Sequence, residues 1–211
     1  HSCMERKNIF VYSLGAILIA GVMWFFISGG DAHIDAPKNG EAVIAFGDSL
    51  IEGVGTSAGN DFVSILSMRL QTPIIQAGVS GDTTASGLLR LERDVLSRNP
   101  KVVILLLGGN DAIRRIVPEE TFANLEAIIN RIHAHGAGVL LIGVRGGLLS
   151  DKYKSGFKAL AEKTDVSFVP NILEDIFAHA DRMYDAIHPN DNGHLLMADR
   201  IEPVLRAMLG R

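Results

Sequence analysis

Short runs of β-branched and aliphatic residues alternate along the chain with longer amphipathic stretches. The short runs predict strands at residues 42–46, 73–77, 102–107, 139–143 and 167–169. The longer stretches predict helices at residues 61–70, 85–96, 118–136, 152–163 and 192–209. This alternation predicts an α/β fold, a three-layer α/β/α sandwich with a five-stranded parallel sheet. Ligands of such sheets bind beyond the carboxyl ends of the strands, so candidate chemistry is expected in the loops that follow them.

The N-terminal segment interrupts this alternation, because residues 8–30 contain no charged side chain. Its apolar core at residues 9–27 is about 19 residues long, enough at about 1.5 Å per residue to cross a hydrocarbon layer of ~30 Å. Arg6 and Lys7 precede the core and Asp31 follows it, which predicts a membrane anchor with a cytoplasmic N-terminus and the rest of the chain outside. A cleaved signal segment is the alternative.

Composition and charge narrow the possible classes of protein. The 211 residues, 47% of them hydrophobic, suffice for one large core. A net charge of −4 offers no basic surface for nucleic acid, and the single cysteine, Cys3, excludes an internal disulfide and a cysteine-based zinc site. We therefore divide the chain into a remnant at residues 1–3, an anchor or signal segment at 4–30, a polar linker at 31–40 and one folded domain at 41–211.

Two glycine-containing loops follow the first two predicted strands. The first has the sequence Gly-Asp-Ser-Leu at residues 47–50, which taken alone is typical of a turn or of a serine that caps a helix. It is not the Gly-x-Ser-x-Gly elbow, because Ile51 occupies the position of the second glycine. The loop at residues 78–84 matches neither a P-loop nor a dinucleotide-binding loop, which leaves Gly81 as a candidate main-chain amide donor.

Two further blocks with polar side chains lie later in the chain. Asn110 follows the third predicted strand within Gly-Gly-Asn-Asp, and Asp185 precedes His188 by three residues near the C-terminus. Taken alone, an asparagine in a turn usually has a structural role, and a histidine is usually a surface residue or a hydrogen-bonded core residue. Loops at one edge of a parallel sheet meet, however, so together they favour a single site.

These four blocks, in this order, resemble those of the SGNH or GDSL hydrolases, and the resemblance extends over residues 41–209. Their contexts are most similar to the thioesterase I/protease I/lysophospholipase L1 branch and to bacterial arylesterases. The resemblance implies a flavodoxin-like sheet and a serine esterase or acyl hydrolase without metal or cofactor. It also implies a small-molecule or lipid ester as substrate. We expect a monomer, although no residue pattern indicates the oligomeric state, and the N-terminal segment predicts a location in the bacterial periplasm or at the extracellular face. The apparent anchor departs from that branch, whose members are usually exported through a cleaved signal.

The expected chemistry needs a base, because a serine hydroxyl is a poor nucleophile until its proton is removed. We expect His188 to be that base for Ser49, with Asp185 orienting the ring and stabilising the imidazolium. The resemblance implies three oxyanion donors, the amides of Ser49 and Gly81 and the side chain of Asn110. Four residues are candidates for substrate binding: Ile113, Arg114, Ile116 and Leu148.

Other interpretations stay open from the sequence. Asp48 and Asp111 adjoin the candidate positions, but we interpret them as groups that brace the loops, since a carboxylate would oppose an oxyanion. The same blocks occur in carbohydrate and peptidoglycan O-acetylesterases, and an inactive, membrane-tethered binding module is a third possibility. A metal site is a fourth, although Pro189 and Gly193 would interrupt the helix needed to align its residues, Asp185, His188, Asp191 and His194.

Overall fold

The structure is a computed structural model that describes residues 35–144 and 151–211. The predicted anchor at residues 4–30, the remnant before it and the candidate residue Leu148 lie outside the described residues. Within the described ranges, no helix is both long enough and apolar enough to cross a membrane. Asp35, which the sequence assigns to the linker, accepts a hydrogen bond of 2.7 Å from the N–H of Val139. The ordered packing therefore includes residues before position 41.

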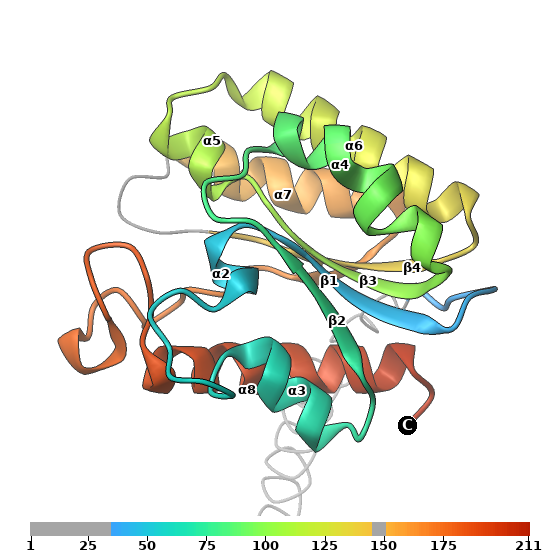
Figure 1. The fold of residues 1–211 in the computed structure, drawn as a ribbon. Helices are drawn as coiled ribbons and strands as arrows, with labels where there is room; N and C mark the ends of the chain where they lie inside the picture. The colour runs from blue at the N-terminus through green and yellow to red at the C-terminus, as the bar shows by residue number, and fades with distance from the viewer. Residues whose placement is uncertain (1–34, 145–150) are drawn as a thin grey trace, which may run out of the picture. The chain divides into compact units, whose positions relative to one another are not determined.

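Five parallel strands form the sheet, as the sequence predicts, in the order β2-β1-β3-β4-β5 (Figure 1). Each predicted run lies within two residues of a strand, and the bounds are β1 (Ala42–Gly47), β2 (Ile74–Gly78), β3 (Pro100–Leu106), β4 (Gly138–Ile142) and β5 (Ser167–Val169). The first strand of the chain lies between β2 and β3 in this order, so the loop that follows β1 has a strand end on either side. Gly47 pairs with Gly78 on β2 and with Leu106 on β3.

Helices cover both faces of the sheet. One face carries α4 (Thr84–Asp94), α6 (Pro118–Ala134) and α7 (Asp151–Thr164), and the other carries α3 (Phe62–Arg69) and α8 (Asp191–Met208) (Figure 1). Strand β1 packs against the helices on both faces of the sheet. Val43 and Ala45 belong to the hydrophobic cluster on one face, and Ile44 and Phe46 belong to the cluster on the other. A strand that is buried on both faces is apolar throughout, which is the pattern that made these strands recognisable in the sequence.

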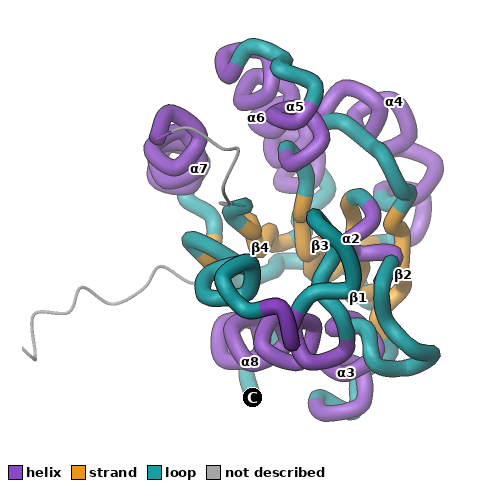
Figure 2. Tube along the Cα trace, turned by 90° about the vertical axis from the view of Figure 1, so that its left-hand side faces the viewer, coloured by secondary structure: helices purple, strands orange, loops and turns teal. Residues whose placement is uncertain are grey.

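Short helices occur where the sequence predicts only loops. They are α2 (Ser49–Glu52), α5 (Gly109–Ile113), and the 3-10 turns η1 (Leu96–Arg98) and η2 (Ala180–Arg182). Because α2 and α5 have only one turn or a little more, they show no helical periodicity. Figure 2 looks toward the carboxyl edge of the sheet, where α2 lies in front of the strand ends. Ser49 and Asn110 both belong to these short helices, so the two helices place the candidate site.

Candidate active site

Ser49 is held at the carboxyl end of β1 by a tight strand-to-helix junction. A Cβ atom at Gly47 would lie 2.1 Å from the carbonyl oxygen of Leu106, so glycine permits the close approach of β1 and β3 there. Asp48 then caps α2, its side chain accepting a 3.1 Å hydrogen bond from the N–H of Leu50. Ser49 is the first residue of the helix, where the N–H group has no acceptor within the helix itself.

A hydrogen-bonded series connects Ser49 to the C-terminal block. The Oγ of Ser49 lies 3.1 Å from Nε2 of His188, and Nδ1 of His188 lies 2.8 Å from Oδ2 of Asp185. The other oxygen of Asp185 accepts hydrogen bonds from the N–H groups of Ile187 at 2.8 Å and of His188 at 2.7 Å. The structure therefore brings together Ser49, Asp185 and His188, although Ser49 and His188 are 139 residues apart in sequence.

The electrostatics of Asp185 fix the roles of the two ring nitrogens. The hydrogen bond from His188, followed by that from the N–H of Ile187, lowers the pKa of Asp185 from its usual 3.8 to about 2. An ionised carboxylate accepts the proton on Nδ1, which leaves the lone pair of Nε2 facing the hydroxyl of Ser49. This arrangement can remove a proton from the hydroxyl of Ser49.

The candidate oxyanion donors Gly81 and Asn110 line the same cavity as Ser49. Gly81 has a φ angle of +81°, a backbone conformation that favours glycine, and its carbonyl accepts a 2.8 Å hydrogen bond from Arg114. The side-chain nitrogen of Asn110 donates to the carbonyl of Asp82 at 3.0 Å and to Oδ2 of Asp48 at 3.3 Å. Both N–H groups of this amide thus have acceptors, and the longer contact, to Asp48, is the one that an oxyanion would most easily replace.

Asp48 and Asp111 brace the loops, in agreement with the interpretation from sequence. Asp111 is fully buried and accepts hydrogen bonds from the N–H of Thr84 at 2.9 Å and from the hydroxyl of Thr121 at 3.3 Å. Asp48 is 3% exposed, and burial raises its pKa from 3.8 to about 7 against the opposing hydrogen bond from Leu50. Asp48 and Asp185 therefore differ strongly in their affinity for a proton.

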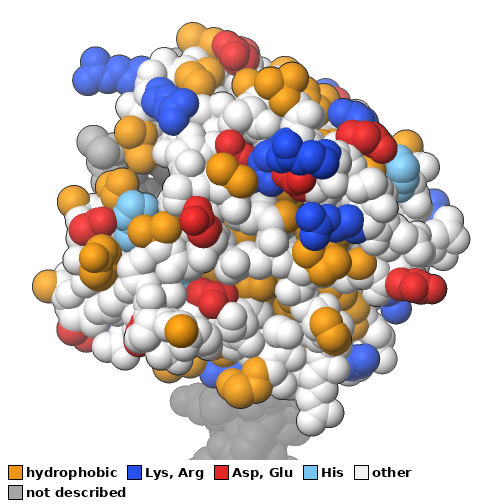
Figure 3. Space-filling view, viewed as in Figure 1, with side chains coloured by type: hydrophobic (Ala, Val, Ile, Leu, Met, Phe, Trp, Pro, Cys, Tyr) orange, Lys and Arg blue, Asp and Glu red, His pale blue; other side chains and the backbone are white. Residues whose placement is uncertain are grey.

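An open cavity of about 550 Å³ extends from this group. Its walls include Ser49, Gly81, Asn110 and His188, and most of the remaining wall is apolar: Leu50, Val54, Ile113, Val144, Leu173, Phe177, Ala186 and Ile187. On the left of Figure 3, where the loops at the carboxyl edge lie, hydrophobic side chains gather around a histidine. The cavity can therefore hold an apolar group next to the hydroxyl of Ser49.

Comparison with known proteins places this arrangement in a family. Residues 45–196 match the sequence profile of the GDSL-like Lipase/Acylhydrolase family. The chain belongs to this family. It is 29% identical over 177 residues to thioesterase 1/protease 1/lysophospholipase L1 of Escherichia coli K12, a match that covers 80% of this chain and 85% of the relative.

Solved structures agree with this assignment. The crystal structure of TesA superposes with a TM-score of 0.75 at 27% identity, covering 80% of this chain and 99% of that one. AlinE4, an SGNH-hydrolase family esterase, superposes with a TM-score of 0.63 at 34% identity over 81% of this chain and 95% of its own. The protein is therefore a GDSL hydrolase with the SGNH α/β fold, and it is an ester-hydrolysing enzyme.

The candidate substrate-binding residues of this GDSL hydrolase have different places. Ile113 lines the cavity, whereas among the described residues Arg114 and Ile116 are not part of its wall. Arg114 binds the Gly81 carbonyl instead, and the carbonyl of Ile116 accepts a hydrogen bond of 3.0 Å from Tyr153. The sequence analysis missed the wall residues Leu173 and Phe177, because they lie in an irregular segment without a motif.

The residues of the alternative metal site make other contacts in this GDSL hydrolase. Asp191 accepts hydrogen bonds from Ser57 and Asn60, and buried His194 stacks on Phe62 and accepts its N–H at Nδ1. Burial lowers the pKa of His194 to about 4. The described ranges contain no group of three or more His, Cys, Asp or Glu side chains placed to hold a metal ion.

Proposed function

We propose that this enzyme cleaves carboxylic esters, and thioesters, of acyl chains longer than acetyl, through an acyl-enzyme formed on Ser49. The observation that carries the proposal is the hydrogen-bonded series Asp185–His188–Ser49, which opens directly onto an apolar cavity. The name of the Escherichia coli relative, which includes thioesterase and lysophospholipase, agrees with an acyl substrate. A lysophospholipid or a simple aryl or alkyl ester would present such a chain.

Acylation begins when the Oγ of Ser49 attacks the carbonyl carbon and Nε2 of His188 takes the hydroxyl proton. The resulting imidazolium is stabilised by the carboxylate of Asp185, which stays ionised at neutral pH. Collapse of the tetrahedral intermediate breaks the bond to the alcohol or thiol, which leaves with the proton from His188. Water, activated by the same imidazole, then hydrolyses the acyl-enzyme and regenerates Ser49.

The negative charge of the tetrahedral intermediate falls on the former carbonyl oxygen. We propose that the N–H groups of Ser49 and Gly81 and the side-chain amide of Asn110 bind this oxygen. Asn110 must then give up one of its present acceptors, and the 3.3 Å contact to Asp48 is the weaker one. The side-chain oxygen Oδ2 of Asp48 thus holds the amide until the oxyanion replaces it.

The decisive experiment measures hydrolysis of p-nitrophenyl esters from C2 to C16 by the wild type and by Ser49→Ala. We expect activity to be highest with medium or long acyl chains and to disappear, together with the acylation burst, in the variant. Preference for C2 would instead favour the O-acetylesterase alternative. Near-normal activity of Ser49→Ala would overturn the proposed mechanism.

The segment at residues 4–30, with its apolar core at residues 9–27, leads to a separate proposal about location. We propose that it anchors the enzyme in a bacterial membrane with the catalytic domain on the periplasmic or extracellular side. The full chain, expressed in bacteria, is then expected to stay in the membrane fraction after carbonate washing and to be open to protease added to spheroplasts. Release of the enzyme in a form that lacks this segment would favour the cleaved signal.

A further inference from the structure

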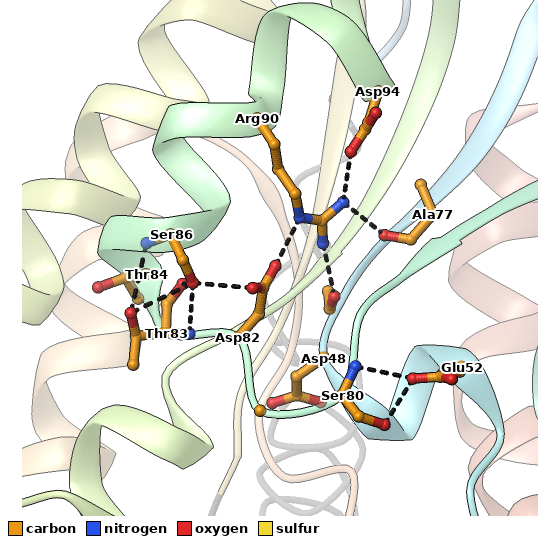
Figure 4. Close-up of polar contacts among 12 residues, drawn as sticks. Asp48, Glu52, Ala77, Ser80, Asp82, Thr83, Thr84, Ser86, Arg90 and Asp94 are labelled. Carbon is orange, nitrogen blue, oxygen red and sulfur yellow. Dashed lines mark hydrogen bonds and ion pairs between the residues drawn. The ribbon is translucent and has the colours of Figure 1, made fainter.

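A buried arginine on α4 joins several parts of the candidate site. Arg90 is 9% exposed, and its guanidinium lies 4.3 Å from the centre of the Phe46 ring. Figure 4 shows the guanidinium between the end of β2 and the turn that precedes α4. It pairs with the carboxylates of Asp82 and Asp94, the latter at 3.1 Å. A buried cation with two carboxylates is a substantial structural element, but its other contacts point beyond stability.

The remaining donors of Arg90 bind two main-chain carbonyls at adjacent strand ends. Nη2 donates to the carbonyl of Gly47 at 2.8 Å, and Nη1 donates to the carbonyl of Ala77 at 3.0 Å. Gly47 ends β1 and Ala77 is the penultimate residue of β2. One planar group therefore fixes the points at which the chain leaves both strands for the candidate site.

Each of these contacts lies close to a candidate oxyanion donor. Gly47 is two residues before Ser49, and Asp82 directly follows Gly81. The carbonyl of Asp82 also accepts the 3.0 Å hydrogen bond from Asn110. Arg90 thus reaches all three donors, two along the chain and the third through one further hydrogen bond.

We propose that Arg90 is a positioning residue of the oxyanion hole, which sets the distance between the Ser49 loop and the Gly81–Asp82 turn so that the three donors converge on one oxygen. This inference rests on the proposed function, because it concerns the stabilisation of the same intermediate. Donors placed in advance stabilise the transition state without reorganisation, and a misplacement of about 1 Å can reduce the rate about 100-fold.

The fork geometry of the guanidinium is essential to this role. Its nitrogens reach Asp82, Gly47 and Ala77 in one plane, whereas the ammonium of a lysine is a single point that cannot span the same acceptors. Glu52 makes a second connection between the same segments, accepting the N–H of Ser80 at 2.7 Å, but this contact is exposed to solvent. Because solvent weakens such contacts, Arg90 is expected to be the main connection.

The test compares Arg90→Lys with Arg93→Lys in the full-length protein. Lysine keeps the positive charge between the carboxylates, so we expect the fold to be retained while the fork is lost. Arg93 is a matched control, since it lies on the same helix, also pairs with Asp94 and has a side chain 76% exposed. Steady-state hydrolysis of a p-nitrophenyl ester is measured well below the melting temperature of each variant.

We expect Arg90→Lys to lower kcat about 10- to 100-fold with KM changed by less than about threefold, because donors of the transition state are displaced while the acyl cavity is untouched. The rate of inactivation by a p-nitrophenyl phosphonate, which forms a tetrahedral adduct on Ser49, falls in the same proportion. Arg93→Lys keeps both rates. Unchanged kcat and inactivation rate in Arg90→Lys would overturn the inference.

If Arg90→Lys does not fold, Asp82→Ala decides the question, since it removes the acceptor that connects Arg90 to the Gly81 turn and leaves the ion pair between Arg90 and Asp94 in place. The same selective loss of kcat supports the inference, and its absence overturns it. A wild type without Ser49-dependent ester hydrolysis would overturn the proposed function and this inference together. An active wild type with an unimpaired Arg90→Lys or Asp82→Ala would overturn the inference alone.

Discussion

The two sides of the candidate site are held in different ways. On the inner side, Ser49, Gly81 and Asn110 come from three loops at the ends of β1, β2 and β3, and buried polar groups connect these loops. On the outer side, Asp185 and His188 lie in one short segment before α8, where the side chain of Asp185 is 42% exposed. The inner side depends on long-range contacts, whereas the outer side is almost self-contained.

The difference follows from what each side has to position. In the proposed mechanism, three donors from separate segments must converge on one atom. This requires contacts between those segments, and Arg90 and Asp111 make such contacts in the interior. To orient the imidazole of His188, one carboxylate is enough. Asp185, three residues earlier in the chain, binds both the ring and the backbone N–H of His188. The two sides also shift the pKa of a carboxyl group in opposite directions. The pKa of buried Asp48 is raised to about 7, and that of exposed Asp185 is lowered to about 2.

The largest expected effect comes from the outer side. His188→Ala removes the base, and we expect kcat to fall by about 10⁵- to 10⁶-fold, as for removal of the base from other serine hydrolases. Because His188 lies in a solvent-exposed loop, the melting temperature of His188→Ala should stay close to that of the wild type. Initial rates with a p-nitrophenyl ester and a thermal melt check both points. A loss of less than about 100-fold would show that another group acts as the base.

A smaller loss is expected from the inner side. Asn110→Ala removes one of three oxyanion donors, so kcat should fall by about 10²- to 10³-fold with little change in KM. Asn124→Ala is the matched control, because that asparagine binds the hydroxyl of Thr84 at 3.2 Å and does not line the cavity. Its kcat should stay within about threefold of the wild type. Equal losses in both variants would indicate general disturbance of the α4–α6 contact instead of loss of a donor.

The same contrast explains how much the sequence could predict. Strands β1, β3 and β4 were recognisable because each is buried on both faces, and edge strand β2 was recognisable from its short apolar run although Gln76 is exposed. The blocks after β1, β2 and β3 place Ser49, Gly81 and Asn110 at one edge. The helices α2 and α5 were missed, because one turn has no periodicity. Arg90 lies on an amphipathic helix, where a charged residue indicates the solvent side, and its burial results from contacts with β1 and β2 that no local pattern contains.

The sequence analysis also did not select Phe177 and Ile187, which contribute to the apolar wall of the cavity. Both residues lie in the irregular segment between β5 and α8, and both are more than one third exposed. Isolated apolar residues in a loop are ordinary on a protein surface, so the sequence offers no reason to select them. Their role depends on where the Asp185–His188 segment places them, next to the hydroxyl of Ser49.

The smallest expected effect tests the two carboxylates directly, through the pH dependence of stability. Between pH 5 and pH 7 the unfolded chain has Asp48 ionised, because the usual pKa is 3.8, while the folded protein retains the proton up to about pH 7. The folded state then binds more protons, so its stability falls as the pH rises through this interval. Asp48→Asn lacks this titration and should gain on the order of 2 kcal/mol relative to the wild type from pH 5 to pH 7.

Asp185→Asn is the control for this measurement. The folded pKa of Asp185 is about 2, so the carboxylate is ionised in both states above pH 5, and its contribution is lost only as the pH falls toward 2. Urea unfolding at pH 5, 6 and 7 should therefore give a constant difference between Asp185→Asn and the wild type. If the free energy of unfolding of Asp48→Asn also differs from that of the wild type by a constant amount, Asp48 ionises in the folded state as readily as in the unfolded chain. Burial on the inner side would then not raise the pKa of Asp48.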